Sequence, residues 1–465
     1  MLEINEFLFR ARLDNVNLFK LQRYMRRSEI SRKVMGFMDW SAACEPQVTV
    51  AAGAGDGKPE GAFVSKHFSA LQAVEGFLDA LTNASRDGRI LVTYGGKEES
   101  GRRKGSSTMK NKTQQQQQQR QQQQQEREEE EPSVKFLMLN PAVHFDEIVQ
   151  KARALVLVGG TMQPTGDLVR QLFSTVDSSR VEVFSCGHVI PKENLLPLCV
   201  SKGPSGKTFN FTYSRRGSDE QLDELGRLMS NVCKFVPGGV VCFLASYDYL
   251  DQASKEIRGS FVLQRWKASG TFRQLSKLKS IFSEPRSAKD VDVVLRDFSV
   301  AAKAGAWKKS IGEGDSSVVG GSSGGSLLLS VVGAKMSEGI NFSDDLARCV
   351  VMVGLPYPDK RDPELKQKMA YLDEAAPASG GKAGREYYSS ICMRAVNQSI
   401  GRSIRHAGDY ASILLVDERY RNEQVVRLLP RWIAERVVKP ANFGQCFVAL
   451  RQFFKRMHES QQRGA

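Results

Sequence analysis

The chain has 465 residues, a formal net charge of +14 and 41% hydrophobic residues. This length allows two or three domains with sizeable cores, and the charge favours a polyanionic partner such as nucleic acid or an acidic membrane surface. No stretch approaches the roughly 18 consecutive apolar residues of a membrane span, and residues 1–10 lack a signal-peptide pattern. The sequence therefore predicts a soluble intracellular protein.

Helical patterns and low-complexity sequence alternate in the first third of the chain. Residues 15–37 place apolar side chains at near-helical spacing among arginines and lysines, which predicts one basic amphipathic helix. A Gly/Ala-rich linker at 51–61 precedes a second helical pattern at 68–81. Residues 95–132 contain two glutamine runs and an acidic run, with too little apolar surface to fold alone. We expect a disordered insertion there.

From residue 135 onward, short apolar runs alternate with amphipathic segments. Continuous apolar runs are typical of buried parallel strands, and helices between them would cover both faces of a sheet, so the pattern predicts an α/β fold. A Gly/Ser-rich stretch at 312–325 is expected to be a surface loop. The predicted strands are 136–139, 154–158, 240–244, 327–332, 350–353 and 413–416, and the predicted helices are 167–176, 219–236, 247–257, 288–304, 363–371 and 389–405.

The eight cysteines are scattered, with no Cys-x-x-Cys pair and no histidine at the spacing of zinc ligands. Disulfides are rare in the cytosol and nucleus, so this pattern predicts reduced, mostly buried thiols. We expect that this chain binds no metal ion.

Residues 201–208, SKGPSGKT, imitate a phosphate-binding P-loop. A P-loop needs a glycine five residues before Gly206, where Ser201 stands, and a helix after its threonine. Residues 209–213 instead alternate aromatic and polar side chains, as in a strand, and we reject the P-loop. The Asp-Glu-Ala-Ala run at 373–376 imitates a metal-holding box, but it follows a helical pattern and not a buried strand.

The most informative stretch spans residues 396–406, VNQSIGRSIRH. At about 100° per residue, Gln398, Arg402 and Arg405 would lie on one side of a helix, and Gly401 would let a neighbouring backbone or a ligand approach closely. Two guanidinium groups one turn apart match the phosphate oxygens of a nucleotide triphosphate. Arginines at this spacing also form ordinary solvated helix faces, so the spacing alone leaves both interpretations open.

Three segments follow predicted strands, where the ligand sites of α/β folds gather. They are residues 158–164, 245–247 and 332–342. In the last of them, Gly333 and Gly339 free the backbone to approach a ligand, and the polar residues between and beyond them supply donors and acceptors. Glycine-rich strand exits are often plain turns, so each segment taken alone is a weak signal.

The order of these segments resembles the XPD-like iron-sulfur DNA helicases of superfamily two, most closely the chromosome-loss branch involved in sister-chromatid cohesion. Residues 159–164 resemble motif III of that family, 246–247 motif IV, 333–342 motif V and 398–405 motif VI. Asn341 departs from the aspartate that is usual in the wider family, as the chromosome-loss branch does.

This resemblance covers residues 1–40 and 133–460 and implies the C-terminal part of such a helicase. The P-loop, the four iron-sulfur cysteines and the Asp-Glu-Ala-His box are expected in a region that precedes Met1. The implied parts are a helical remnant of the arch at 1–44, a flexible region with Gln-rich low complexity at 45–132, the closing strands of the first RecA-like lobe at 133–178, and the second RecA-like lobe at 179–465.

The resemblance also implies roles for individual residues in ATP-driven 5′ to 3′ translocation on single-stranded DNA. ATP and Mg²⁺ would be bound mainly by the missing first lobe, which would also hold the iron-sulfur cluster. The implied catalytic residues are Gln398, Arg402 and Arg405; those that bind ATP or couple it to DNA are Glu338, Gly339, Asn341 and Gly401; and those that contact DNA are Thr161, Ser246, Tyr247 and Lys335.

The same resemblance implies a nuclear monomer that acts on single-stranded or forked DNA, with cohesion, replication or repair proteins as partners and no membrane. A different class of function is also open. Without a P-loop, the polypeptide would be a nucleic-acid-binding or interaction fragment with no turnover of its own.

Overall fold

A computed structural model describes residues 1–44, 70–82, 87–93, 132–251, 261–305, 324–339, 342–376 and 380–463. The chain forms two compact units, Met1–Val143 with Pro363–Tyr371 and His144–Asp362 with Leu372–Ala465. The predicted linker lies outside the described residues, as do the predicted insertion and the Gly/Ser-rich loop except for their last one or two positions.

The first unit combines helices with a small antiparallel sheet of order β1-β2-β3. Ile4, Leu18, Leu81 and Ile90 form its buried core. The helix predicted at 68–81 is confirmed as α4. The elements are β1 (Leu2–Glu3), α1 (Ile4–Arg10), α2 (Leu18–Ser28), α3 (Ile30–Cys44), α4 (Ala70–Thr82), β2 (Gly88–Thr93) and β3 (Ser133–Met138).

The single helix predicted over 15–37 is wrong, because α2 and α3 are separate helices that meet at Glu29. Asn17 caps the start of α2, where its side chain accepts a hydrogen bond from the N–H of Lys20. Glu29 has φ +50°, a left-handed conformation that ends a right-handed helix. The apolar spacing continues through this residue, so periodicity carries no sign of the break.

The strand predicted at 136–139 is confirmed as β3, but it is antiparallel and not parallel. It pairs along its whole length with β2, for which there was no prediction, from Gly88 opposite Met138 to Thr93 opposite Ser133. The strand predicted at 154–158 is wrong. That segment pairs with no strand of the described chain, and its Val158 is 90% exposed. An apolar run becomes a strand only where a neighbouring strand pairs with its backbone hydrogen-bonding groups.

The second unit contains a six-stranded sheet of order β4-β9-β8-β5-β7-β6 in which every pair is parallel, so the predicted α/β fold with a parallel sheet is confirmed. Four predicted strands appear in it close to their predicted bounds. The strands are β4 (Leu195–Cys199), β5 (Gly239–Leu244), β6 (Ser280–Ser283), β7 (Ser326–Val331), β8 (Cys349–Val353) and β9 (Ala411–Val416).

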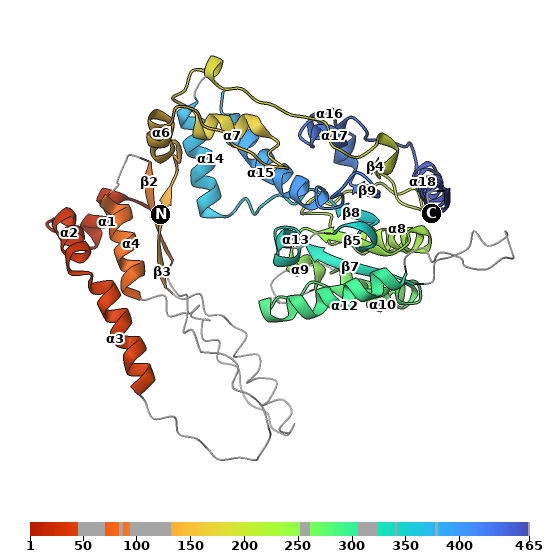
Figure 1. Cartoon of the computed structure of the whole chain (residues 1–465), viewed down its shortest axis with the longest axis horizontal. Coiled ribbons are helices and arrows are strands. Elements are labelled where there is room, and N and C mark those ends of the chain that lie inside the picture. Colours follow the sequence, from red (N-terminus) through yellow and green to blue (C-terminus); the bar gives the residue numbers. More distant parts are fainter. Residues whose placement is uncertain are drawn as a thin grey trace, which may run out of the picture. The chain divides into compact units, whose positions relative to one another are not determined.

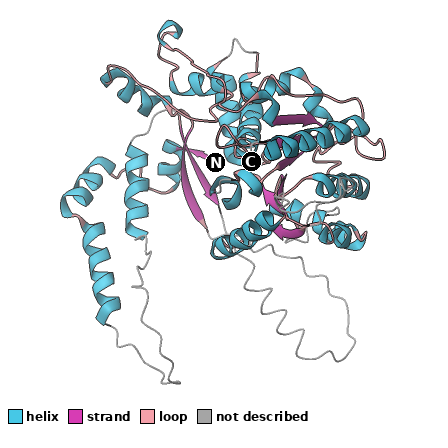
Figure 2. Ribbon diagram, turned by 45° about the vertical axis from the view of Figure 1, so that its right-hand side comes forward, coloured by secondary structure: helices cyan, strands magenta, loops and turns pink. Residues whose placement is uncertain are grey.

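Helices pack against both faces of this sheet (Figures 1 and 2). Val240 and Cys242 belong to one hydrophobic cluster with residues of α8 and α18, whereas Val241 and Phe243 belong to a second cluster with residues of α12 and α15. This alternation explains the continuous apolar runs, because both faces of each inner strand are buried. None of the described helices is long and apolar enough to cross a membrane.

Most helices predicted after residue 135 are confirmed, although their ends differ from the predicted ones. The helix predicted at 247–257 is described only as the four-residue α9. The helices are α6 (Ala142–Lys151), α7 (Thr165–Leu172), α8 (Asp219–Phe235), α9 (Tyr247–Leu250), α10 (Val262–Ala268), α11 (Thr271–Ser276), α12 (Val291–Ala304), α13 (Lys335–Gly339), α14 (Pro363–Ala375), α15 (Ala383–Ile400), α16 (Glu423–Val426), α17 (Arg431–Ala434) and α18 (Phe443–Arg463).

Candidate functional site

The helix that carries the candidate phosphate-binding residues ends earlier than predicted. α15 stops at Ile400, and Arg402 and Arg405 follow it in a turn and a loop. The prediction that Gln398, Arg402 and Arg405 share one helix face is therefore wrong. The hydroxyl of Ser403 donates to the carbonyl of Ile400 at 2.8 Å, a local bond that competes with helix continuation after a glycine. Gln398 and Arg405 are exposed and Arg402 is half-buried.

Residues 161–167 pack directly against α15. The fully buried Asn397 donates from Nδ2 to the carbonyl oxygens of Gln163 at 3.0 Å and Leu428 at 2.9 Å. Three residues earlier on α15, Arg394 forms an ion pair with the buried carboxylate of Asp167. The segments that resemble motifs III and VI, the first and last in sequence order, are therefore neighbours in the folded chain.

Gly401 lies where these two segments approach most closely. A Cβ atom at this position would lie 2.9 Å from Cγ2 of Thr161 and 2.8 Å from the carbonyl oxygen of Asn397. Both distances are too short for a side chain at this position. A close approach at Gly401 was predicted, but the group that approaches from the other segment is the Thr161 side chain and not backbone or a ligand. Its φ of −69° is ordinary, and the requirement for glycine comes from space alone.

Glu284, which had no predicted role, holds the turn between β7 and α13. Its carboxylate is buried, and it accepts hydrogen bonds from the Ser330 hydroxyl at 2.7 Å, the Val331 N–H at 2.8 Å and the Met336 N–H at 2.8 Å. Charged acceptors form the stronger hydrogen bonds, so Glu284 fixes the loop that resembles motif V. Glu284 directly follows β6, which ends at Ser283. Because no strand was predicted there, nothing in the sequence singled out Glu284.

Ser246 and Tyr247 already have partners within the protein. The hydroxyl of Ser246 caps α9. The hydroxyl of Tyr247 donates to the Pro285 carbonyl at 3.4 Å, and the Arg286 guanidinium lies 5.2 Å from the centre of its ring. Burial, and then the negative charge of Glu284, raises the pKa of Tyr247. The motif IV residues thus adjoin the carboxylate that holds the motif V turn.

The segment that resembles motif V also includes Gly333, the predicted DNA contact Lys335 and the predicted coupling residues Glu338, Gly339 and Asn341. Gly333 has φ +75°, a conformation that suits glycine, and Lys335 is exposed at the start of the helix. Gly339 ends α13, whereas Asn341 and the side chain of Glu338 lie outside the described parts of the chain.

We expect Glu284→Gln to lower the free energy of unfolding by about 2–3 kcal/mol. The amide turns one acceptor oxygen into a donor that faces an N–H group, and it removes the charge that strengthens the remaining bonds. Urea unfolding monitored by fluorescence measures the loss. Glu193→Gln, at an exposed glutamate, is the control. Equal stability of the two variants would refute the proposed role of Glu284.

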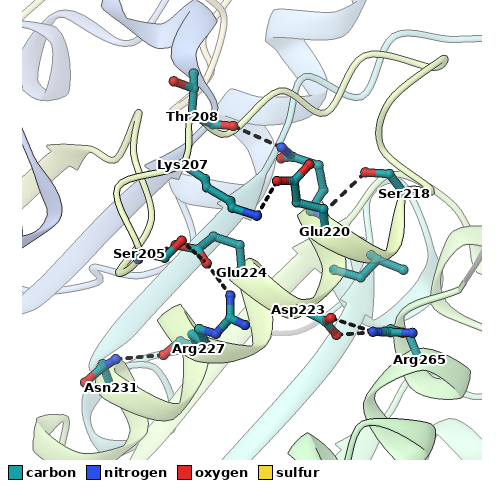
Figure 3. A network of polar contacts seen from close by, with 12 residues as sticks. Ser205, Lys207, Thr208, Ser218, Glu220, Asp223, Glu224, Arg227, Asn231 and Arg265 are labelled. Atoms are coloured by element: carbon teal, nitrogen blue, oxygen red, sulfur yellow. Dashed lines mark hydrogen bonds and ion pairs between the residues drawn. The ribbon is translucent and has the colours of Figure 1, made fainter.

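The segment that imitates a P-loop forms a tight turn whose centre is occupied by an acidic side chain (Figure 3). Glu224 is buried and accepts hydrogen bonds from the N–H of Ser205 at 2.6 Å and from its hydroxyl at 2.8 Å. Lys207, the counterpart of the P-loop lysine, is paired with Glu220. A carboxylate thus lies where a phosphate would have to bind, which agrees with the rejection of a P-loop.

The predictions for residues 209–213 and for residues 373–376 have different outcomes. The strand predicted at 209–213 is wrong, because these residues pair with no strand in the described chain. Residues 373–375 are the last residues of α14, so this run ends a helix and does not follow a buried strand. Asp373 accepts a hydrogen bond from the N–H of Gly384 at 2.8 Å, so this carboxylate stabilises the start of α15.

One group among the described residues has a geometry that could hold a metal ion, with ligand atoms of Asp344, His406 and Asp409 within 4.8 Å of one another. The buried Arg348 already donates to Asp409 Oδ1 at 2.8 Å, and His406 Nε2 lies 2.9 Å from Asp344 Oδ1. Arg348 balances the buried charge, so the group is explained as an ion-pair network without a metal ion.

Seven of the cysteines have described side chains; all seven are free and six of them are buried, in agreement with the predicted reduced and mostly buried thiols. Burial raises the pKa of Cys199 to about 11 and the pKa values of Cys233 and Cys349 to about 12.

Three comparisons bear on this geometry. The helicase C-terminal domain family matches residues 229–436. The ATP-dependent DNA helicase DDX11 of Mus musculus is 42% identical over 97% of this chain and 47% of its own length. The ATP-dependent DNA helicase CHL1 of Sclerotinia sclerotiorum is 34% identical over 93% of this chain and 48% of its own length. A solved XPD helicase structure, 17% identical, covers 66% of this chain and 46% of its own with a TM-score of 0.39.

The chain spans about half the length of the curated relatives that it matches. The match to the helicase C-terminal domain includes the segments that resemble motifs IV, V and VI. On these identities, the chain belongs to the helicase family of the DDX11 and CHL1 proteins.

Proposed function

We propose that the chain is the C-terminal part of an ATP-dependent DNA helicase that moves 5′ to 3′ along single-stranded DNA. The observation that carries this proposal is the 42% identity to a DNA helicase across 97% of the chain. The packing of Thr161 against Gly401 supports it, because this contact joins two helicase-like segments more than 200 residues apart in the sequence.

Arg402 and Arg405 are the proposed arginine fingers. ATP, the substrate, and Mg²⁺ would be bound mainly by a first lobe with its own P-loop, and the two guanidinium groups would reach the phosphates from this chain. Both follow the carboxyl end of α15, where a positive charge is favourable next to the helix dipole. The exposed Gln398 on the last turn of α15 would sense the γ-phosphate or the attacking water.

The proposed DNA contacts are Thr161, Ser246, Tyr247 and Lys335. Glu338, Gly339 and Asn341 would link the nucleotide state to the grip on DNA, together with Gly401. Glu284 supplies a physical route for such coupling, because its carboxylate binds the start of α13 and also adjoins Tyr247. A shift of α13 would therefore change the surroundings of the motif IV tyrosine.

The proposed setting is the nucleus, where the protein would act as a monomer on single-stranded or forked DNA with cohesion, replication or repair proteins. By the family resemblance, the iron-sulfur cluster would belong to a preceding region of the polypeptide.

The chain alone is expected to bind a single-stranded oligonucleotide without hydrolysing ATP. With about four phosphate contacts, affinity should fall roughly 50-fold between 50 and 200 mM salt, because each contact releases condensed counterions. Fluorescence anisotropy of a labelled oligo-dT and a phosphate-release assay measure the two properties.

The outcomes separate the possibilities. A flat salt response would contradict a groove that tracks phosphates. Brisk ATP hydrolysis by the unaided chain would refute the proposal that the ATP site is divided between two lobes. DNA binding that never supports hydrolysis, even when a first lobe is supplied, would instead favour a binding fragment without turnover.

A further inference from the structure

The turn at residues 212–217 presents an aromatic ring and a guanidinium group together. Tyr213 is 71% exposed. The guanidinium carbon of Arg216 lies 5.0 Å from the centre of the Tyr213 ring and 5.4 Å from the centre of the Tyr249 ring. The Thr212 carbonyl closes the turn by accepting the N–H groups of residues 215 and 216. This cation–π pair covers only part of the Tyr213 ring and leaves the rest open to a ligand.

The turn is held rigidly from both sides. The hydroxyl of Tyr249 donates to the carbonyl of Arg216 at 2.9 Å, and the N–H of Phe211 donates to the fully buried Asp417 at 2.9 Å. Tyr249 follows β5 and Asp417 follows β9, so both anchors lie at the carboxyl ends of parallel strands. This is the edge of an α/β sheet where ligands bind.

Two further arginines flank the ring. Arg215 is exposed in the same turn. Arg361, in the segment that follows β8, is 78% exposed and interacts with the Tyr213 side chain as well as with Asp359. An exposed ring among exposed guanidinium groups combines a stacking surface for a base with charges for phosphates, the combination by which proteins bind single strands without sequence preference.

We propose that Tyr213 and Arg216 form a stacking platform for one base of single-stranded DNA, with Arg215 and Arg361 facing the neighbouring phosphates. This inference rests on the proposed function and adds a contact outside the segments that resemble the helicase motifs. Every base has a π-face, so the platform would tolerate any sequence, as a translocating enzyme requires.

The test is the affinity of the 465-residue chain for a fluorescent 12-nucleotide oligo-dT. Tyr213→Ala is expected to weaken binding by about fivefold or more, because base stacking on an aromatic ring is lost. Its salt dependence should stay unchanged, since no charge is removed. Tyr213→Phe keeps the ring and should bind like the parent chain. Arg215→Gln should lower the slope of log affinity against log salt by about 0.7.

Two matched variants remove similar pairs elsewhere. Phe272→Ala removes the ring beside Lys267, and Arg451→Gln removes the guanidinium beside Phe235. In each pair the cationic group lies 5.9 Å from the centre of the ring. Neither should change oligonucleotide affinity. Because Tyr213 is exposed, Tyr213→Ala should melt at the temperature of the parent chain; if it does not fold, Tyr213→Leu provides the same test.

Parental affinity in the Tyr213 variants that lack the ring would overturn the platform while leaving the proposed function intact. The platform would also be overturned if a Tyr213 variant lost affinity for a fluorescent ATP analogue and not for the oligonucleotide, because the ring would then bind ATP and not DNA. If the parent chain itself binds no oligonucleotide, the proposed function fails together with this inference.

Discussion

Replacing Arg402 with alanine in a polypeptide that carries both helicase lobes is expected to lower kcat for ATP hydrolysis by about a thousandfold or more. An arginine finger stabilises the charge that develops on the transferring phosphoryl group, and its loss has an effect of this size. Arg402→Lys should restore only part of the rate, because an ammonium group keeps the charge but not the forked donors. DNA binding should be retained, since the proposed DNA contacts lie on other segments.

The measurements are DNA-stimulated ATP hydrolysis at saturating ATP and anisotropy with labelled oligonucleotide. Arg451→Ala, which removes an exposed arginine from α18, is the control and should leave both unchanged. Hydrolysis at the parental rate in the Arg402 variant would refute the finger role. Joint loss of hydrolysis, DNA binding and thermal stability would instead indicate a folding defect.

Strands buried on both faces were the predictable part of the fold. β5, β7, β8 and β9 are inner strands whose side chains face helices on both sides, so their sequences are almost wholly apolar. The edge strands β4 and β6 were not predicted, although β4 (Leu-Leu-Pro-Leu-Cys) is also apolar. β4 includes Pro197, which an edge strand tolerates because one side of its backbone needs no ladder bond. β6 is a four-residue strand, Ser-Ile-Phe-Ser.

Contacts between distant residues limited what could be predicted of the candidate site. The family was readable from short segments, and the identity to DDX11 and CHL1 confirms it. The role of Glu284 could not be read from the sequence, because the three groups that donate hydrogen bonds to its carboxylate lie 46 to 52 residues further along the chain. The end of α15 at Ile400 was also unreadable, since the apolar spacing continues to Ile404, which is buried in the loop that follows.

The loop with Arg402 and Arg405 is followed by a buried ion pair. Arg348 directly precedes β8 and Asp409 lies just before β9, and their side chains are 5% and 0% exposed. Arg348 NH1 also donates to the Tyr410 carbonyl at 3.0 Å, and its guanidinium carbon lies 3.9 Å from the centre of the Tyr410 ring. This pair joins the starts of two neighbouring strands and so fixes one end of the arginine-bearing loop.

We expect Asp409→Asn to lower the free energy of unfolding by about 3–5 kcal/mol, because the buried charge of Arg348 then keeps only the partly exposed Asp345 as a partner. Asp345→Asn is the matched control. Asp345 pairs with the same guanidinium but is 33% exposed, so its loss should cost less than about 1 kcal/mol. Combining Arg348→Met with Asp409→Asn should restore part of the stability, since no buried charge then remains. Urea unfolding of the four proteins measures these differences, and equal losses in the two asparagine variants would contradict a role for burial.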